Sequence, residues 1–351
     1  MQKPLEETKS GRMRALHWAL SGAGFVILVW FTTQIDFGGL VSGFRELRWP
    51  FLVEAVLFTG LNVALKALRW QTIVYRALGV HVPWGQAVAA VLAGVAGASF
   101  VPGRSFDAAK PLLLRVSHGV PVSNGIPAVI AERILDLVAL LLLFLVTVAV
   151  GRQLALLPSG SAVSATAVGL TLVLLAFLFG AGRGLDILQR WLAVRFPRFR
   201  VRPFLASLRS AADLMCRSGR SGAVALYSLG AIVAEVARTQ AVFRAFGVDL
   251  PCSVVAFSFT TSILIGLLAF IPGGVGITET FQAGLVALLA PQAASAIVHG
   301  AVLLDRVLSY YLLVIVGSLV LVAAFRIRMR GEEAREAAYD RAQQGAQEAA
   351  L

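Results

Sequence analysis

The stretch "LLAFIPGGVGITETF" (residues 267–281) decides how this chain folds. A run of apolar side chains meets one proline and three glycines, and one carboxylate follows: Pro272, Gly273, Gly274, Gly276 and Glu279. Proline removes a backbone donor and glycine relaxes the torsional limits, so a helix that reaches this point can turn sharply. The sequence therefore predicts a broken helix inside apolar sequence.

The composition around this break is that of a membrane protein. The chain has 351 residues, of which 58% are hydrophobic and 14% charged, and its mean hydropathy is +0.80. Long apolar runs approach the ~20 residues that cross a bilayer core, at residues 17–31, 136–150, 163–181 and 310–325. None shows the alternation of a barrel strand. We expect an all-α, polytopic integral membrane protein.

The sequence shows no motif that is typical of a metal or cofactor site. Cys216 and Cys252 lie far apart, and the four histidines form no HExxH motif. We therefore expect no metal site and no cofactor.

The net charge of +12 points to a membrane surface rather than to nucleic acid, because Lys and Arg collect on cytoplasmic loops. Residues 182–220 hold nine arginines, and we expect this segment to lie along the anionic inner leaflet. No nucleic-acid partner is expected.

An internal repeat relates residues 69–103 to residues 238–273. Polar and special residues recur in register: Arg69 with Arg238, Gln71 with Gln240, Arg76 with Arg244, Gly79 with Gly247, and Pro83 with Pro251. Further along, Glu132 and Arg133 pair with Asp305 and Arg306. Hydrophobicity alone would not copy such residues, so the match indicates two related halves.

Two topologies fit the hydropathy, and the basic residues favour one of them. If residues 84–120 and 252–291 each enter the membrane and leave on the same side, 24 of the 31 Lys and Arg residues lie in the cytoplasm with both termini. The basic residues left outside are Arg45, Arg48, Arg152, Arg238 and Arg244. The other topology, in which these runs cross fully, stays open because residues 254–271 are long enough to span.

The favoured topology makes the repeat an inverted one in the inner membrane. A single membrane domain (1–325) contains repeat one (about 50–150), the basic loop and repeat two (about 222–325), and a charged tail follows (326–351). Two re-entrant helical hairpins are surrounded by six full spans, at about 15–33, 50–68, 126–150, 161–181, 222–240 and 301–325.

Both breaks could hold an anion. Unsatisfied amides at the helix end near Gly273, Gly274 and Gly276 suit a phosphate or carboxylate. In the first hairpin, "VPGRSFDAAK" (101–110), we expect Arg104 and Lys110 to grip a phosphate and Asp107 to orient them. The alternative is that each Pro-Gly pair marks an ordinary loop.

Charged residues inside the apolar spans are the other candidates. Glu132, Arg133 and Asp136 occupy one helical turn, and charges inside a membrane usually serve function. The alternative is a self-neutralised Arg133–Asp136 pair that holds helices together. The second repeat keeps Asp305 and Arg306 but has Ser309 in place of the second acid.

The motifs "ALRW", "PGRSFD", "AERILD", "IPGGVGITE" and "LDRV" together resemble the flippase-like family that includes the transmembrane region of lysylphosphatidylglycerol synthases, over most of residues 15–325. Members are regarded as lipid translocases or as membrane modules of lipid-modifying enzymes. The resemblance implies roles for Arg104, Asp107, Glu132, Arg133, Gly273, Gly274, Glu279 and Arg306. Phe106 and Phe270 depart from the usual motifs. No aminoacyl-transferase domain follows residue 325, so synthesis of an aminoacyl lipid is not expected.

The leading hypothesis is a translocase, not an enzyme, that moves an anionic phospholipid or polyprenyl-phosphate-linked lipid by alternating access. The expected substrate-binding residues include the eight that the family resemblance implies, Arg104, Asp107, Glu132, Arg133, Gly273, Gly274, Glu279 and Arg306. They also include Arg69, Lys110, Asp136, Arg238, Gly276 and Asp305. One alternative is a membrane glycosyl- or phosphotransferase, although the first outer loop (34–49) offers only Asp36 and Glu46. Another is an accessory subunit that partners envelope-lipid biosynthetic enzymes.

Overall fold

The structure is a computed structural model that describes residues 45–99, 107, 109–150, 221–269, 271–293 and 295–326, with Val26, Ile27, Val29, Thr33 and Gly169 as isolated residues. Several sequence expectations fall outside this part of the chain. They are the roles of Arg104, Phe106 and Phe270, most of the spans at 15–33 and 161–181, the basic loop 182–220, and the tail after residue 326.

Every element in the described part of the chain is helical, as the sequence predicts. The first half contains α3 (Trp49–Leu78), α4 (Trp84–Ser99), α5 (Ala109–His118) and α6 (Val122–Val150). The second half contains α9 (Ser221–Ala245), α10 (Cys252–Leu268), the 3-10 turn η3 (Pro272–Gly274), α11 (Ile277–Leu289), α12 (Ser295–Arg306) and the π-helical turn η4 (Val307–Tyr311), after which the helix continues to residue 326.

In the part of the chain that the structure describes, four helices are long and apolar enough to cross a membrane: Trp49–Leu78, Val122–Val150, Gly222–Ala245 and Ser295–Arg326. They coincide with four of the six expected spans. The helices of the two expected hairpins are shorter, at 16 and 10 residues for α4 and α5 and 17 and 13 residues for α10 and α11. The members of each hairpin pack against each other.

The break predicted at Pro272 is present. Helix α10 ends at Leu268, and α11 begins only at Ile277. Between them Gly273, Gly274 and Gly276 have φ values of 67°, 65° and 83°, which side chains with a Cβ rarely adopt. These glycines let the chain turn within eight residues and return along α10.

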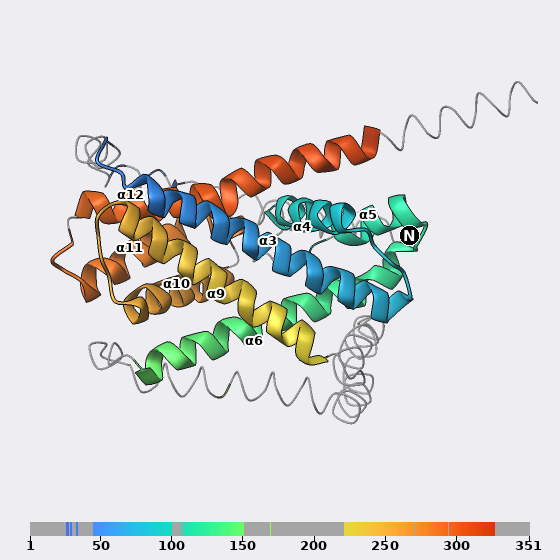
Figure 1. Cartoon of the computed structure of the whole chain (residues 1–351), viewed down its shortest axis with the longest axis horizontal. Coiled ribbons are helices and arrows are strands. Elements are labelled where there is room, and N and C mark those ends of the chain that lie inside the picture. The colour runs from blue at the N-terminus through green and yellow to red at the C-terminus, as the bar shows by residue number, and fades with distance from the viewer. Residues whose placement is uncertain are drawn as a thin grey trace, which may run out of the picture.

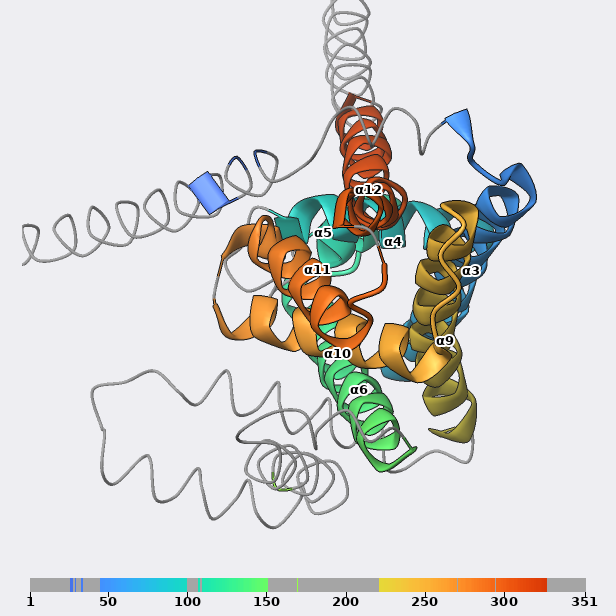
Figure 2. The same ribbon diagram turned by 90° about the vertical axis from the view of Figure 1, so that its left-hand side faces the viewer.

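Each half has its own hydrophobic core. One core is built around Trp70, Ile73 and Val129 of α3 and α6, and the other around Phe243, Val255 and Val302 of α9, α10 and α12. The two halves meet mainly where α3 packs along α9. Both views place these helices side by side (Figures 1 and 2).

Helices α3 and α9 run antiparallel. The Arg48 N–H, just before α3, donates to the Ala245 carbonyl at the end of α9 (2.8 Å), and Asn62 Nδ2 donates to the Ala231 carbonyl near the middle (2.8 Å). The hairpin α4–α5 lies toward the right end of the molecule in Figure 1 and the hairpin α10–α11 toward the left end.

Residues matched by the sequence repeat make matching contacts. Gln71 Nε2 donates to the carbonyl of Val82, the residue before Pro83, at 2.7 Å. Its counterpart Gln240 donates to the carbonyl of Leu250, the residue before Pro251, at 2.8 Å. Gly79 and Gly247 both have positive φ values after the preceding helix. The same local geometry therefore leads from the long helix into the hairpin in each half.

Candidate functional site

Six charged side chains from the first half form the first charge cluster: Arg69, Asp107, Lys110, Glu132, Arg133 and Asp136. Its tightest pairs join three helices. Arg69 of α3 lies 2.5 Å from Asp136 Oδ1 and 3.4 Å from Glu132 Oε1, both on α6. Lys110 Nζ of α5 lies 2.6 Å from Glu132 Oε2. These pairs fix the first hairpin to the long helices.

Arg133 is the loosely held cation of this cluster. Its guanidinium lies 3.5 Å from Asp136 Oδ2 and 3.9 Å from Asp107 Oδ2, and its Nε has no hydrogen-bond partner. The side chains of Arg133 and Asp136 are 33% and 31% exposed, whereas Arg69 and Glu132 are buried. The cluster is therefore reached from outside through Arg133.

Asp107 is enclosed at the base of the first hairpin. Gly94 of α4 makes room for it, because a Cβ at Gly94 would collide with Asp107 Oδ2. Burial raises the pKa of the Asp107 carboxyl, and attraction from Lys110 and Arg133 partly opposes this rise. Its Oδ2 accepts no hydrogen bond, although Lys110 Nζ is 3.7 Å away.

The second charge cluster contains Arg238, Glu279, Asp305 and Arg306. Arg238 Nε of α9 donates to Asp305 Oδ1 at 2.8 Å, and Arg306 Nε donates to Glu279 Oε1 at the same distance. Tyr311 Oη also donates to Glu279 Oε1 (3.2 Å). Arg306 Nη2 reaches the Gly273 carbonyl at 3.4 Å, so the cluster holds the hairpin tip.

The carboxylate of Glu279 lies in the first turn of α11, where a negative charge complements the helix dipole. The place in which the sequence predicts a bound anion at the second break is thus close to one of the protein's own carboxylates.

The two clusters use equivalent pairs but differ in accessibility. Arg69 with Glu132 in the first matches Arg238 with Asp305 in the second, and Arg133 beside Asp107 resembles Arg306 on Glu279. Arg306 is 4% exposed, compared with 33% for Arg133. The first cluster is thus partly exposed, and the second is buried.

The structure brings together the predicted residues that it describes, within these two clusters. The expected Arg133–Asp136 contact is confirmed, and Gly273, Gly274 and Gly276 form the tip beside Arg306. The predicted grip of Lys110 on a phosphate stays a prediction, since Lys110 lies on Glu132. Arg238, which the charge count assigns to the outer side of the membrane, is buried and pairs with Asp305 at 2.8 Å.

Sequence reasoning missed a charged pair that joins the two halves. Lys66 Nζ of α3 lies 2.6 Å from Glu235 Oε1 of α9, which also accepts from Asn62 Nδ2 at 3.1 Å. Charge inside an apolar helix was a usable signal for both residues. Trp70 was also missed, and its ring lies 5.1 Å from Lys110 Nζ in a cation–π contact. No group of three or more His, Cys, Asp and Glu side chains in the described ranges is placed to hold a metal ion.

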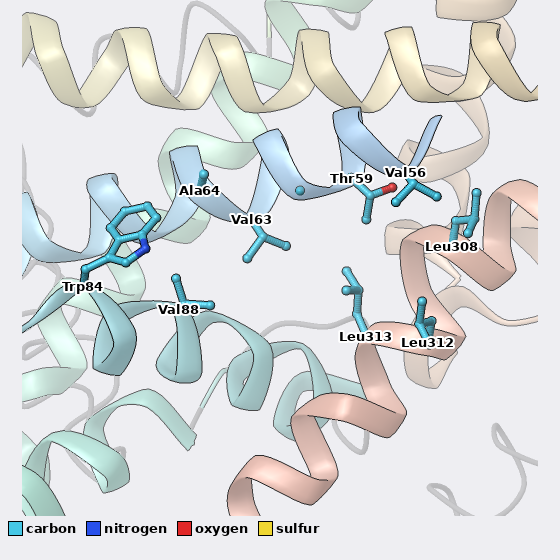
Figure 3. Close-up of a pocket in the computed structure, with 10 residues that line it drawn as sticks. Val56, Thr59, Val63, Ala64, Trp84, Val88, Leu308, Leu312 and Leu313 are labelled. Carbon is cyan, nitrogen blue, oxygen red and sulfur yellow. The ribbon is translucent and has the colours of Figure 1, made fainter. Parts of the chain in front are cut away.

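An apolar groove of about 390 Å³ opens between α3, α4 and η4 (Figure 3). Trp84 and Val88 line it from α4, and Leu308, Leu312 and Leu313 from the C-terminal helix. Helix α3 supplies the third wall with Val56, Thr59, Gly60, Val63 and Ala64. Between the two halves, Phe144 of α6 stacks on Phe257 of α10, with ring centroids 5.8 Å apart.

Comparison with known proteins agrees with this picture of a membrane module. Residues 17–317 match the model of the lysylphosphatidylglycerol synthase TM region. The chain is 28% identical to a UPF0104 membrane protein of Methanothermobacter thermautotrophicus over 77% of this chain and 82% of that protein, and 25% identical to a UPF0104 membrane protein of Pyrococcus horikoshii over 77% and 85%.

A third relative differs in length and name. The chain is 27% identical to the glycosyltransferase AglD of Haloferax volcanii, over 78% of this chain but only 49% of that protein. Since the family model covers most of the chain, this multi-pass membrane protein belongs to the family of the lysylphosphatidylglycerol synthase transmembrane region.

Proposed function

We propose that this protein is a lipid translocase that moves an anionic phospholipid or a polyprenyl-phosphate-linked lipid across the cytoplasmic membrane. One observation carries the proposal. Arg133 is one-third exposed and lies 3.5 Å or more from its carboxylates, whereas Arg69 and Lys110, the other cations of the first charge cluster, are buried and tightly paired. A guanidinium in that state can take a phosphate oxygen with a charge-assisted hydrogen bond.

The groove between α3, α4 and η4 suits the acyl chain of the same lipid. Its lining is apolar, and it lies on a helix long enough to cross the membrane. Helix α3 carries both the groove and, five residues beyond Ala64, Arg69 of the first charge cluster. Five residues of α-helix rise about 8 Å. Along the axis of α3, the groove therefore ends about one and a half turns before the first charge cluster.

Alternating access follows if the repeat is inverted. Three observations support an inverted repeat: α3 and α9 are antiparallel, the hairpins lie toward opposite ends of the molecule (Figure 1), and matched residues make matched contacts. The open first cluster and the occluded second cluster then represent one of two end states, related by exchange of the roles of the halves. In this proposal the hairpins are re-entrant and both termini are cytoplasmic.

The test is a translocation assay in proteoliposomes that contain a fluorescent phosphatidylglycerol, with a membrane-impermeant quencher reporting the outer leaflet. Arg133→Gln is expected to slow translocation at least about tenfold, since a hydrogen bond to a charged group contributes ~1.5–3 kcal/mol. Arg115→Gln, which removes an exposed cation from the same hairpin, is the control. Equal rates for folded Arg133→Gln and wild-type protein would contradict the proposal.

A membrane transferase is the second candidate, because one relative is named a glycosyltransferase. The match covers only half of that relative, so its activity transfers to this chain only as a hypothesis. Transfer of a labelled sugar from a nucleotide or lipid-linked donor to a lipid acceptor by the purified chain would favour this candidate over the translocase.

A further inference from the structure

The first charge cluster is electrically balanced before any ligand arrives. Its cations Arg69, Lys110 and Arg133 face an equal number of carboxylates, Asp107, Glu132 and Asp136. A phosphodiester headgroup at Arg133 adds a negative charge to a cluster in which Asp107 and Glu132 are fully buried and Asp136 is 31% exposed. An uncompensated buried charge is costly. Binding therefore requires a second event that restores neutrality.

Asp107 is the carboxylate least stabilised as an anion. Glu132 accepts from Lys110 at 2.6 Å, and Asp136 from Arg69 at 2.5 Å. Within the described part of the chain, Asp107 accepts the Lys110 backbone N–H at 3.4 Å, and its buried Oδ2 has no hydrogen bond there. Burial also raises the pKa of this carboxyl, in the direction that favours its neutral form.

Among the described groups around Asp107, Arg133 is the one that can turn away to a ligand. Helix α4 presents Gly94, which has no side chain, and α5 presents Lys110, which is held by Glu132. Helix α6 presents Glu132 and Arg133. Neutral Asp107 no longer attracts Arg133 across 3.9 Å, so the guanidinium can turn fully to an incoming anion.

We propose that an anionic phosphodiester headgroup and one proton bind to this cluster together, and that Oδ2 of Asp107 takes up the proton. Water supplies the proton, the carboxylate becomes a carboxylic acid, and no bond of the headgroup is made or broken. The inference rests on the proposed headgroup site at Arg133. It adds a coupling ion: a pH difference across the membrane would bias the direction of transport.

Calorimetry on the full chain in a neutral detergent tests this coupling. Dioctanoyl-phosphatidylglycerol is titrated near neutral pH in two buffers that differ in ionisation enthalpy, and dimethyl phosphate is titrated in parallel as the headgroup without acyl chains. Both probes stay ionised, so any buffer-dependent heat reports protons bound by the protein. We expect uptake of close to one proton per lipid, and an affinity that falls about tenfold per pH unit above the titration of Asp107.

Two variants test whether Asp107 is the group that takes up the proton. Asp107→Asn is expected to bind without proton uptake and with a flat pH profile, whereas Asp249→Asn, which changes an exposed acid paired with Arg244, keeps the uptake. Lipid binding to wild-type protein with no proton exchange overturns the coupling and leaves the headgroup site standing. Absence of binding by both probes overturns the headgroup site as well. Uptake with dimethyl phosphate alone would assign the cluster to small anions instead of lipid and overturn the lipid coupling.

Discussion

The buried charged residues of this protein form ion pairs inside an otherwise apolar interior. Arg69 and Arg238, which occupy equivalent repeat positions, are 1% and 3% exposed, and each faces carboxylates of the helix that ends its half. A buried pair adds little net stability, but removing one partner leaves an isolated charge. Loss of either arginine is therefore expected to destabilise the protein mainly because it leaves a buried carboxylate without its partner.

Replacement of Arg69 by Gln should destabilise the protein by ~3–5 kcal/mol, because Glu132 and Asp136 lose their closest guanidinium. Thermal unfolding of the detergent-solubilised protein measures this effect. Arg244→Gln breaks a pair whose side chains are both exposed and should cost less than ~1 kcal/mol. Equal melting shifts for the two variants would show that burial of the first pair is unimportant.

Asp107→Asn should leave the melting temperature unchanged or raise it at neutral pH. The pKa of Asp107 is raised by burial, so its ionised form works against folding above that pKa, and a neutral amide removes the penalty. Protonation gives the same relief in the wild type, so the difference between the two proteins should shrink as pH falls. A large loss of stability in Asp107→Asn at all pH values would contradict this account.

At the scale of elements, the helix break at Pro272 and the turn at η4 form one unit. Gly273 has a φ of 67°, and a Cβ on it would collide with the hydroxyl of Tyr310 in η4. The π-helical turn η4 (Val307–Tyr311) directly follows Arg306, whose Nη2 donates to the Gly273 carbonyl at the hairpin tip. Such turns often mark functional sites in helices.

Gly273→Ala should cost ~1–3 kcal/mol, since the backbone is strained and the tyrosine must move. Gly284→Ala, in the middle of α11 with open space around it, should be neutral or stabilise by up to ~1 kcal/mol. Chemical denaturation of both variants measures the difference. A Gly273→Ala protein as stable as Gly284→Ala would mean that the tip relaxes freely.

The groove is also a property of elements, and Gly60 provides a way to fill it. A Cβ there would meet nothing within 4 Å, and Gly60 lines the groove, so we expect Gly60→Phe to occupy the groove without disturbing α3. We expect slower translocation of the fluorescent lipid and an unchanged melting temperature. Gly284→Phe places the same ring at another open helical glycine outside the groove and should retain the wild-type rate.

At the scale of the whole molecule, the proposed mechanism depends on the two halves being inverted in the membrane. His81 and Asp249 follow the long helices of the two halves at near-equivalent positions, and both are exposed. In a chain without cysteine, His81→Cys and Asp249→Cys should react with an impermeant thiol reagent from opposite sides of the cell membrane, with Asp249→Cys labelled from outside. Labelling from the same side would exclude alternating access by inverted halves.

Sequence reasoning alone predicted the membrane class, the four described helices that are long enough to span, and the helix break at Pro272. Each follows from local physics: ~20 apolar residues fit a bilayer, and a proline followed by glycines cannot continue a helix. The matched residues of the repeat also indicated which side chains share a role. Arg69 and Arg238 were found in this way, and their equivalent buried pairs agree with it.

Which charged side chains meet, and which stay accessible, depends on the packing of the helices. Lys110 reaches Glu132 across 22 residues and Arg238 reaches Asp305 across 67, and nothing in the local sequence sets those partners. The same Glu/Asp-Arg motif is open at Arg133 and buried at Arg306, since packing of α11 and η4 covers the second copy. Accessibility depends on neighbours from distant parts of the chain, and therefore on the fold as a whole.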